Sequence, residues 1–589
     1  MHFGKALDRD LREVPLQIRR KFFRRLTENH KPLFVQRAHL LAYLETISNK
    51  LSTKLKTHSV YYWLYLYRRI KPVLSPRHDN LTDARTTLLV RQIVELAIYK
   101  FAALNRFELS KRSKVNFSKQ WGGYLKLIVD QMGEDRVAIT SMLNSEAEPD
   151  TLIPVEFRPA DYRSIYASEG LAYEYWLCTA RLRSIGKGMK LWFDPATGAF
   201  AYEDAKVTTE AIERFDARLK GVSFFPTLVG IVTPDSLDDR FQQIFSTSYN
   251  VDNIDLTDLF SALQFPAKSR DGGNLSNFVP AFLSVDEFVA QHQYLDGPFK
   301  ATTGFSLEAF LYVLWAISSL ALVPNSFFNS NLNYGFLLFT LLRRGYSVYE
   351  TEEFSNEVKK RLLLRNDLNQ KKHEEIGKII DAALAYILLS KDRQAKITPW
   401  SGGPRPILTQ HKGSWLIDTV GIFEFITRMF TGIHDDGTAR GIIFESTVRS
   451  SVEKFKSEIG LDFGPRKIVE NGVLIDEVDL MVRKNKRVFV CECFSMWMPL
   501  DFEIGNTKTI DARTAQIDKK LEQANETSRY LAGHRVGANY DFRDVDEFIP
   551  IVVSPFIEWL PSTDSRYWLS KKQPRVMSVD ELVEFLRSQ

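Results

Sequence analysis

Two acidic residues in the last third of the chain, Asp479 and Glu492, have the spacing expected of a divalent-metal site. They lie in GVLIDEVDLMVRKNKRVFVCECF, two β-rich runs joined by a basic turn at residues 483–487. Strand alternation lets a hairpin bring both carboxylates to one surface, where they repel each other unless a cation lies between them. With the main-chain carbonyl of Cys493 they would form a hard oxygen site suited to Mg²⁺, with Mn²⁺ as an alternative. Such an ion polarises a phosphate and helps its bound water to ionise.

A third acid, Glu445, lies on the helix expected over residues 442–459. The apolar residues of this segment recur at helical spacing and define one face: they are Phe444, Val448, Val452, Phe455 and Ile459. Glu445 lies about 60° from the centre of that face. It therefore borders the core, and it is the candidate to bind or orient the ion from the helix.

Each of these acids, taken alone, is also typical of a surface carboxylate paired with a nearby base. Glu492, however, is flanked by apolar residues in VFVCECF, and an unpaired charge on a buried strand is costly. Cys491 and Cys493 lack a second cysteine pair, so core packing explains them better than zinc. The loop with His434, Asp435 and Asp436 would meet a second metal or a phosphate, or would simply be solvated.

The order of these residues resembles the signature of the PD-(D/E)xK, or restriction-endonuclease-like, nuclease superfamily. Glu445 matches the helix acid, Asp479 the strand acid and Glu492 the acid of the E-x-K tripeptide, whose lysine is replaced by Phe494 in CECFS. The later segments are also similar, with a long helix, an apolar strand and a final helix capped by Ser578. The resemblance covers residues 407–589 and implies an α/β restriction-endonuclease-like fold.

The missing lysine has a chemical consequence, because in this superfamily it orients the attacking water and stabilises the developing phosphorane charge. Phe494 can do neither. Some members carry the basic group on the following helix, whose inner face here is expected to comprise Ile517, Leu521, Ala524, Ser528 and Leu531. Lys520 lies about 60° from the centre of that face and is the candidate for a relocated catalytic lysine. Arg513, about 40° away, is the reserve.

The first 126 residues are strongly basic. They contain 26 Lys and Arg against 9 Asp and Glu, a charge of +17, so that the rest of the chain carries 5 − 17 = −12. This asymmetry is typical of nucleic-acid binding, although solvated faces of amphipathic helices would give the same count. The densest clusters are candidate phosphate contacts: Arg19, Arg20, Lys21, Arg24, Arg25, Arg68 and Arg69. Phosphate contacts depend on salt and carry no sequence information.

Length and pattern predict a multidomain protein. A chain of 589 residues with 44% hydrophobic content exceeds one ordinary core, and two to four domains are expected. Helical periodicity indicates a basic helical region at residues 1–150 and a mostly α region at 151–400 that resembles no known family. Prolines and glycines around residue 400 read as a linker, which places an α/β domain at residues 401–589.

Three cysteines without a regular framework argue against a secreted, disulfide-stabilised fold. The first residues lack the apolar stretch of a signal peptide. The most apolar run, residues 310–323, is shorter than the roughly 20 residues of a membrane span and is expected to be a buried helix. These features predict a cytoplasmic protein without membrane contact.

Together these patterns predict a Mg²⁺-dependent phosphodiesterase that cleaves DNA, and fold-level analogy suggests restriction, anti-phage defence or DNA repair. The alternative is a nuclease fold that has lost its lysine and acts as a non-enzymatic nucleic-acid-binding or assembly subunit. RNA is a further candidate target, since the basic segment does not distinguish A-form from B-form backbones. A protein partner or activator fits either hypothesis.

Overall fold

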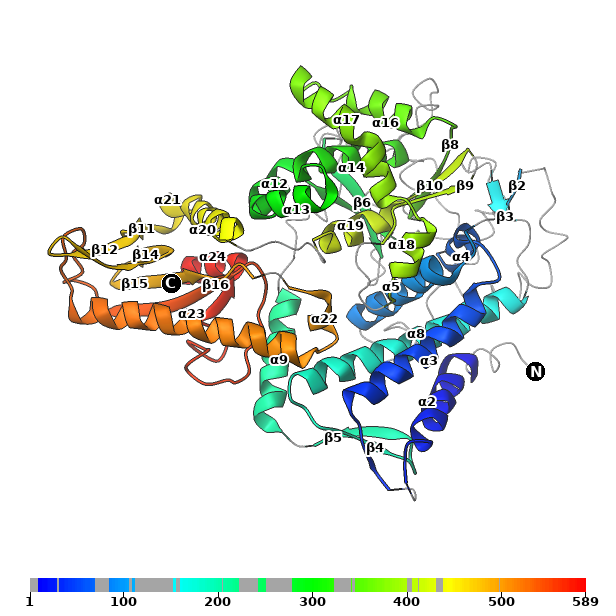
Figure 1. Ribbon diagram of the computed structural model, residues 1–589, viewed down its shortest axis with the longest axis horizontal. Helices are drawn as coiled ribbons and strands as arrows, with labels where there is room; N and C mark the ends of the chain where they lie inside the picture. Colours follow the sequence, from blue (N-terminus) through cyan, green and yellow to red (C-terminus); the bar gives the residue numbers. More distant parts are fainter. Residues whose placement is uncertain are drawn as a thin grey trace, which may run out of the picture.

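Three groups of helices and strands follow one another along the chain in the computed structural model (Figure 1). We refer to them as the N-terminal unit (residues 9–221), the middle unit (242–430) and the C-terminal unit (438–589). The structure describes residues 9–28, 31–68, 84–104, 109–111, 152–154, 159–203, 205–221, 242–249, 278–322, 341, 345–399, 405–411, 413–430, 438–496 and 498–589. The expectation of a multidomain chain of mixed α/β composition is confirmed.

The N-terminal unit is built on long helices that pack around one apolar core. Its elements are η1 (Arg9–Glu13), α2 (Val14–Arg24), β1 (Leu33–Phe34), α3 (Arg37–Leu55), α4 (Val60–Tyr67), α5 (Ala84–Phe101), β2 (Leu109–Lys111), β3 (Leu152–Pro154), α8 (Pro159–Gly186), β4 (Leu191–Asp194), β5 (Ala199–Tyr202) and α9 (Lys206–Gly221). Helix α8 packs against α3 and α5. The strands β4 and β5 form an antiparallel hairpin, and β1 pairs with β4.

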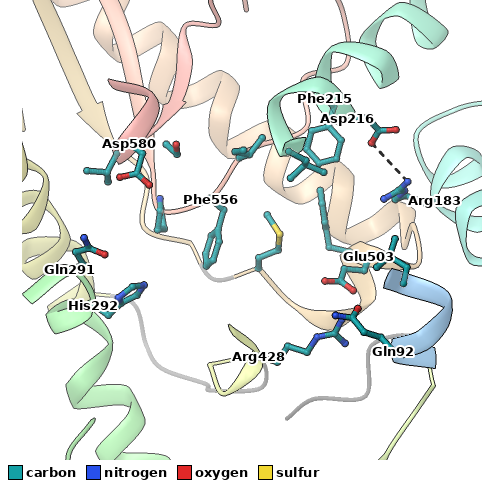
Figure 2. A pocket seen from close by; sticks show the side chains of 18 of the residues that line it. Gln92, Arg183, Phe215, Asp216, Gln291, His292, Arg428, Glu503, Phe556 and Asp580 are labelled. Carbon is teal, nitrogen blue, oxygen red and sulfur yellow. Dashed lines mark ion pairs between the residues drawn. The ribbon is translucent and has the colours of Figure 1, made fainter. Parts of the chain in front are cut away.

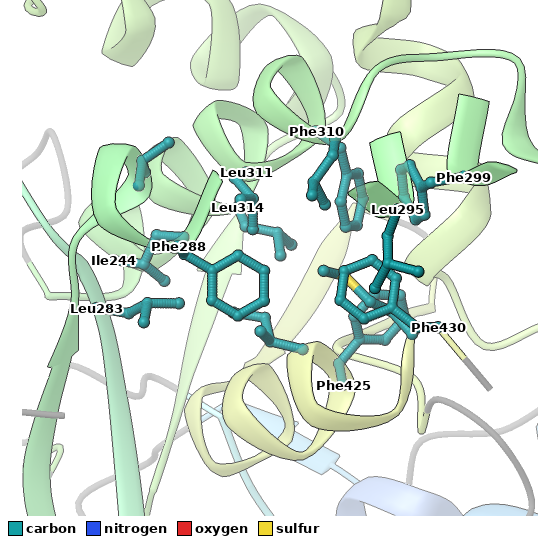
Figure 3. Close-up of a cluster of buried hydrophobic side chains, with 14 of the residues drawn as sticks. Ile244, Leu283, Phe288, Leu295, Phe299, Phe310, Leu311, Leu314, Phe425 and Phe430 are labelled. Atoms are coloured by element: carbon teal, nitrogen blue, oxygen red, sulfur yellow. The ribbon is translucent and has the colours of Figure 1, made fainter. Parts of the chain in front are cut away.

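The middle unit combines helices with two small antiparallel sheets. Its elements are β6 (Ile244–Tyr249), β7 (Phe278–Leu283), α12 (Val285–His292), η3 (Gln293–Leu295), α13 (Asp296–Thr303), α14 (Leu307–Leu322), β8 (Tyr346–Glu350), α16 (Phe354–Leu362), α17 (Gln370–Ile387), α18 (Lys391–Lys396), β9 (Leu408–His411), β10 (Ser414–Asp418) and α19 (Thr419–Arg428). One sheet has the order β8-β10-β9 and the other pairs β6 with β7. Figure 3 shows the core between them, where Phe288, Leu314 and Phe425 from three helices meet.

Contacts in the structure cross both positions at which the sequence predicts a domain boundary. Residue 150 was placed between domains, but α8 returns to pack against α3 and α5, so the N-terminal unit extends to α9. After the predicted boundary near residue 400, β9 and β10 pair with β8 and α19 packs on β6, so these later elements belong to the middle unit. The C-terminal unit begins at α20 (Thr438–Glu453).

The C-terminal unit is a mixed sheet covered by helices on both faces. After α20 come α21 (Lys456–Ile459), β11 (Asp462–Phe463), β12 (Lys467–Glu470), β13 (Val473–Glu477), β14 (Leu480–Lys484), β15 (Arg487–Cys493), α22 (Leu500–Glu503), α23 (Thr507–Gly533), β16 (Glu547–Ser554), β17 (Val576–Ser578) and α24 (Val579–Ser588). The main sheet has the order β11-β14-β15-β16-β17, with β14 antiparallel to β15 and with β15, β16 and β17 parallel.

Apolar side chains alternate between the two faces of this sheet. Leu480, Cys491 and Ile551 face α20 and α24, whereas Met481 and Val490 belong to the core beneath α23. Helix α24 begins at the predicted capping box, in which Ser578 accepts from the Glu581 amide and Glu581 accepts from the Ser578 amide. The sheet is therefore the middle of three layers, with α23 on one face and α20 with α24 on the other (Figure 1).

A buried set of charged residues joins the N-terminal and middle units, and we call it the ionic cluster. It comprises Arg68, Glu95, Arg405, Asp418 and Glu424. Arg68 contacts Glu95 at 2.8 Å and Asp418 at 2.9 Å, and Arg405 contacts Glu95 at 2.7 Å. Burial favours a raised pKa for Asp418, but Arg405 and Arg68 outweigh burial and hold that pKa below its usual range. The two units thus share charges that neutralise each other away from water.

Helix α9 attaches the N-terminal unit to the C-terminal unit. Its Arg218 forms an ion pair with Glu581 at 2.8 Å and donates to the carbonyl oxygens of Glu558 and Val576. The apolar face of α9 lies in a core cluster with residues of the C-terminal unit: Ala211, Phe215, Phe502, Ile510, Ile557 and Trp559. The C-terminal sheet therefore carries a helix that is encoded some 300 residues earlier in the chain.

Within the described part of the chain, no single helix has both the length and the apolar composition of a membrane span. The helical segments Val285–Thr303 and Leu307–Leu322 reach that composition only when taken together, and they are bent by 82° relative to each other. All side chains of α14 except that of Glu308 are buried in the core, as the sequence predicts for this run.

Candidate active site

The hairpin of β14 and β15 places Asp479 beside Glu492. In this antiparallel pair Leu480 lies opposite Cys491, so extending the register by one residue sets Asp479 opposite Glu492. The main-chain amide of Cys493 donates to Asp479 Oδ2 at 2.7 Å. This bond fixes the aspartate side chain at the end of β15. The predicted pairing of these two carboxylates is therefore present.

Lys520 of α23 lies between the two carboxylates. Its Nζ is 2.8 Å from Glu492 Oε2 and 3.7 Å from Asp479 Oδ2, and its side chain is 28% exposed. Glu492 is buried. Lys520, which lies about 60° from the centre of the apolar face of α23, therefore points to the edge of the sheet and not into solvent. The residue proposed from helical geometry is the one that reaches the acids.

Glu445 approaches this group from the other face of the sheet but is held by another residue. Its Oε2 accepts from Arg466 at 2.6 Å. Burial and the nearby Asp479 carboxylate raise the pKa of Glu445, and the hydrogen bond and charge of Arg466 oppose that rise. Arg466 was not among the residues expected from the sequence, because it precedes β12 in a turn and no pattern links it to α20.

Phe494 and Arg513 occupy structural positions. Phe494 is buried in an apolar cluster with Ile517 and Leu521 of α23. Arg513 is almost fully buried, and its guanidinium contacts Glu558 at 2.5 Å and lies 5.3 Å from the centre of the Phe494 ring. Arg513, the reserve candidate for the role of the relocated lysine, therefore pairs with Glu558, whereas Lys520 pairs with Asp479 and Glu492.

The pKa values of Glu492 and Lys520 are shifted because these two residues and Asp479 lie close together away from water. Burial and the charge of Asp479 raise the pKa of Glu492 to about 7, although Lys520 opposes the shift. Burial lowers the pKa of Lys520, but its hydrogen bond to Glu492 and the charges of Glu492 and Asp479 outweigh burial and raise it overall. The site therefore combines an ammonium group with two carboxylates, one of which gains a proton near neutral pH.

The donor set fits a Mg²⁺ ion held by two carboxylates. Within the described residues, Glu492 Oε1 and Asp479 Oδ1 receive no hydrogen bond. In the same residues no three His, Cys, Asp or Glu side chains converge on one point, so Glu445 does not complete a ring of ligands. Mg²⁺ commonly takes one or two carboxylates and fills its remaining positions with water and phosphate oxygens. Asp479 and Glu492 would hold such an ion, and the Cys493 carbonyl remains a predicted ligand.

The pKa of Glu492 leads to a pH-dependent prediction. Its pKa in the folded protein lies above its usual value near 4.5, so the fold binds a proton that the unfolded chain has released, and stability falls as pH rises from about 4.5 through 7. A divalent ion must displace the same proton. Affinity for Mn²⁺ is therefore expected to rise about tenfold between pH 6 and pH 8, measured by titration calorimetry.

Two controls accompany that measurement. Glu492→Gln, which cannot ionise, is expected to bind the ion weakly and without this pH dependence. The number of protons released on binding, obtained from titrations in buffers of different ionisation enthalpy, is expected to approach one per ion at pH 6. An affinity that stays level from pH 6 to pH 8 contradicts the assignment of Glu492 as a ligand.

The candidate phosphate contacts on α2 divide into two groups. Arg19 pairs with Glu174 at 3.3 Å, while Arg20 and Arg24 donate to the carbonyl oxygens of Thr197 and Pro195 in the β4–β5 turn. These contacts attach α2 to the hairpin. Lys21 and Arg25 are exposed. A shallow surface hollow of about 520 Å³ is lined by Gln17, Arg20, Lys21, Arg24 and Arg25.

The remaining residues that the sequence singles out for phosphate or metal binding lie outside α2 along the chain. Arg68 is fully buried in the ionic cluster, so the prediction that it binds phosphate is wrong. The physical reason is that its counter-charges, Glu95 and Asp418, come from distant parts of the chain. Arg69 and the loop residues His434, Asp435 and Asp436 lie outside the described residues. Cys491 and Cys493 are buried and reduced, in agreement with core packing.

Comparison with known proteins gives no match: no protein-family model, no curated protein and no solved structure is similar to this chain.

Proposed function

We propose that the C-terminal unit is a Mg²⁺-dependent phosphodiesterase that cleaves DNA. The observation that supports it best is the position of Lys520, whose Nζ lies 2.8 Å from Glu492 and 3.7 Å from Asp479. This lysine supplies from α23 the basic group that Phe494 cannot supply from β15. A PD-(D/E)xK mechanism would then not require a lysine at position 494.

The resemblance to PD-(D/E)xK nucleases is further supported by the order of the elements. In that superfamily the acids lie on a helix and on two antiparallel strands, followed by a long helix and a parallel strand. Here Glu445 lies on α20, Asp479 directly precedes β14 and Glu492 lies on β15, and α23 and β16 follow. Helices cover both faces of this sheet. That order agrees with the layout implied by the resemblance.

The residues of the chain have distinct roles in the proposed reaction. A Mg²⁺ ion, when bound, would polarise the scissile phosphate and lower the pKa of its bound water. Asp479 and Glu492 position that ion, and the Cys493 amide orients Asp479 through its 2.7 Å hydrogen bond. The Lys520 ammonium orients the attacking water and neutralises charge that develops on the phosphate. Glu445 adds negative charge at the edge, restrained by Arg466.

A plasmid-cleavage assay tests the proposal. Supercoiled and linear DNA are incubated with the full chain in Mg²⁺, Mn²⁺ or EDTA. The wild type is expected to cleave in either metal and not in EDTA, while Asp479→Ala and Glu492→Ala are expected to lose cleavage while retaining DNA binding. Cleavage that persists in both variants, or that persists in EDTA, contradicts the proposed site.

A second candidate function is a non-catalytic, nucleic-acid-binding scaffold. It is favoured by two observations: Lys520 pairs with both carboxylates, as a structural ion pair would, and Phe494 is integrated into the core. No cleavage in any metal by a protein that binds DNA would support this function, and binding of Mn²⁺ in the pH-dependent manner given above would argue against it.

The basic face of α2 is proposed to bind the nucleic-acid backbone. The double variant Lys21→Ala/Arg25→Ala removes two exposed charges, and each lost phosphate contact should lower the slope of log affinity against log salt by about 0.9 for duplex DNA. Binding at low salt is expected to weaken while base preference is unchanged. The measurement is fluorescence anisotropy of a labelled duplex at several salt concentrations.

Lys50→Ala/Lys54→Ala is the matched control, because both residues are exposed on α3 and do not line the hollow on α2. An equal loss in the two double variants would show that only net charge matters and would remove α2 from the site. Competition by matched DNA and RNA duplexes distinguishes the two targets.

A further inference from the structure

A cavity lies where the three units meet, away from the candidate active site. Its volume is about 990 Å³, at the upper end of the range for small-molecule sites. Helices α5, α8 and α9 form one wall, α20 and α24 form another, and the end of α12 with Arg428 belongs to the middle unit. Figure 2 shows side chains from all three units projecting into the space.

One side of the cavity presents hydrogen-bond acceptors. The ring of His292 stacks on Phe288 with 4.1 Å between centroids, and its Nδ1 lies 3.0 Å from the Phe288 carbonyl oxygen. Burial lowers the pKa of His292 to about 4, so the ring is neutral at physiological pH. Nδ1 must then carry the proton donated to that carbonyl, which leaves the Nε2 lone pair as an acceptor.

Asp580 adds a carboxylate on the same side, as Figure 2 shows. It is exposed to the cavity at the start of α24, and burial followed by the charge of Glu581 raises its pKa. Its place in the first turn is favourable to any helix, but α24 is already capped by Ser578 and Glu581. Asp580 is therefore available to accept two parallel hydrogen bonds from a ligand.

Other sides of the cavity present an aromatic ring and guanidinium groups. Phe556 lies toward the middle of the view in Figure 2, between the Asp580 and His292 side and the Arg183 side, with Arg428 below it. Arg183 faces Asp216 at 3.9 Å, a long contact between half-exposed groups. A planar ring stacked on Phe556 would thus share the cavity with the acceptors of Asp580 and His292 and with the guanidinium of Arg428.

We propose that this cavity binds a guanine nucleotide. Guanine offers two adjacent N–H donors, N1 and N2, which match the two oxygens of the Asp580 carboxylate, and its π-face matches Phe556. The phosphate matches the guanidinium of Arg428. Adenine places an acceptor where guanine has the N1 donor, so its pairing with a carboxylate is weaker.

Occupancy of the cavity has a consequence for the neighbouring site. Helix α20 lines the cavity with Phe444, Thr447 and Ser451 and carries Glu445 directly after Phe444. A ligand that moves α20 therefore changes the position of Glu445 relative to Asp479. This regulatory consequence rests on the proposed nuclease function, whereas binding of the nucleotide does not.

The test is titration calorimetry of the full chain with GTP, GDP, ATP and inorganic pyrophosphate. GTP and GDP are expected to bind at least tenfold more tightly than ATP or pyrophosphate. Asp580→Ala should reduce that preference at least tenfold, Arg428→Ala should weaken all nucleotides, and His292→Phe, which keeps the stack on Phe288, should weaken GTP severalfold. Asp511→Ala is the matched control, because Asp511 is exposed on α23 outside the cavity.

Three results would overturn the inference: no nucleotide binding at millimolar concentration, equal binding of ATP and GTP, or pyrophosphate binding as tight as that of GTP. Thermal unfolding of each variant establishes that it is folded. Because the readout is binding, a protein that binds GTP without cleaving DNA would refute the nuclease and retain this site, and the converse result would do the opposite. Hydrogen exchange in α20 with and without GTP reports the predicted movement.

Discussion

Lys520→Met is expected to reduce Mg²⁺-dependent DNA cleavage about 10²- to 10³-fold, the usual effect of removing one group that stabilises transition-state charge. The same change is expected to tighten binding of the ion. In the wild type the ammonium lies 2.8 Å from Glu492 and 3.7 Å from Asp479, so it competes with a metal for the same carboxylates. Single-turnover cleavage and Mn²⁺ titration of one preparation measure both effects.

The opposite signs of these two effects make the prediction specific. Lys519→Met is the matched control, since Lys519 precedes Lys520 on α23 and is exposed. It is expected to cleave like the wild type. If both lysine variants cleave equally, Lys520 is not catalytic. If Lys520→Met loses ion binding and cleavage together, the lysine holds the carboxylates in place and does not act on the water.

Glu95→Ala is expected to destabilise the protein by about 3–5 kcal/mol. Glu95 accepts from Arg68 at 2.8 Å and from Arg405 at 2.7 Å, and all three side chains are almost fully buried. Removing the carboxylate takes away the partner that Arg68 and Arg405 share between the N-terminal and middle units, where water cannot solvate the guanidinium groups. Urea unfolding followed by tryptophan fluorescence measures the change.

Glu203→Ala provides the comparison for that experiment. Glu203 forms an ion pair with Lys190 at 3.0 Å, but both side chains are about half exposed, and such pairs contribute little. Its free energy of unfolding is expected to change by less than about 1 kcal/mol. Equal effects of the two substitutions would show that the ionic cluster does not hold the units together. If Glu95→Ala is not recovered folded, Glu95→Gln tests the same position with its shape retained.

Much of the C-terminal unit is predictable from local pattern, because its strands alternate and its helices carry capping residues. The hairpin, α23, β16 and α24 occur where the sequence predicts them. Alternation alone also puts Val478 on the same side as Leu480 and Val482. In the structure Val478 packs beneath α23 and the other two pack toward α20, because β13 ends at Glu477 and β14 begins at Leu480, so that Val478 belongs to neither strand.

The units themselves are less predictable, because their limits depend on contacts between distant segments. A loop rich in proline and glycine has the same composition whether it separates two domains or turns within one. The strand β10, which follows the stretch near residue 400, pairs with β8 over residues 346–350 of the middle unit. No local signal specifies that pairing.

Charged residues show the same limitation. Arg68 and Lys21 both lie in basic clusters, yet one is enclosed by Glu95 and Asp418 and the other is exposed. Lys520 and Arg513 lie at similar angles from the centre of one helix face, but Glu558 pairs only with Arg513. Helical geometry places a side chain on a face, and only the tertiary fold supplies its partner.

The attachment of α9 to the C-terminal unit has a consequence for biosynthesis. The surface that α9 covers is formed by Phe502, Ile510 and Trp559, which are translated about 280 to 340 residues after its end at Gly221. At about 5 to 20 residues per second, the apolar face of α9 waits roughly 15 to 70 s outside the ribosome for its partner. During that interval Phe215 and its neighbours would be a binding surface for chaperones. A fragment that begins at α20 would expose the complementary apolar surface from the moment it folds.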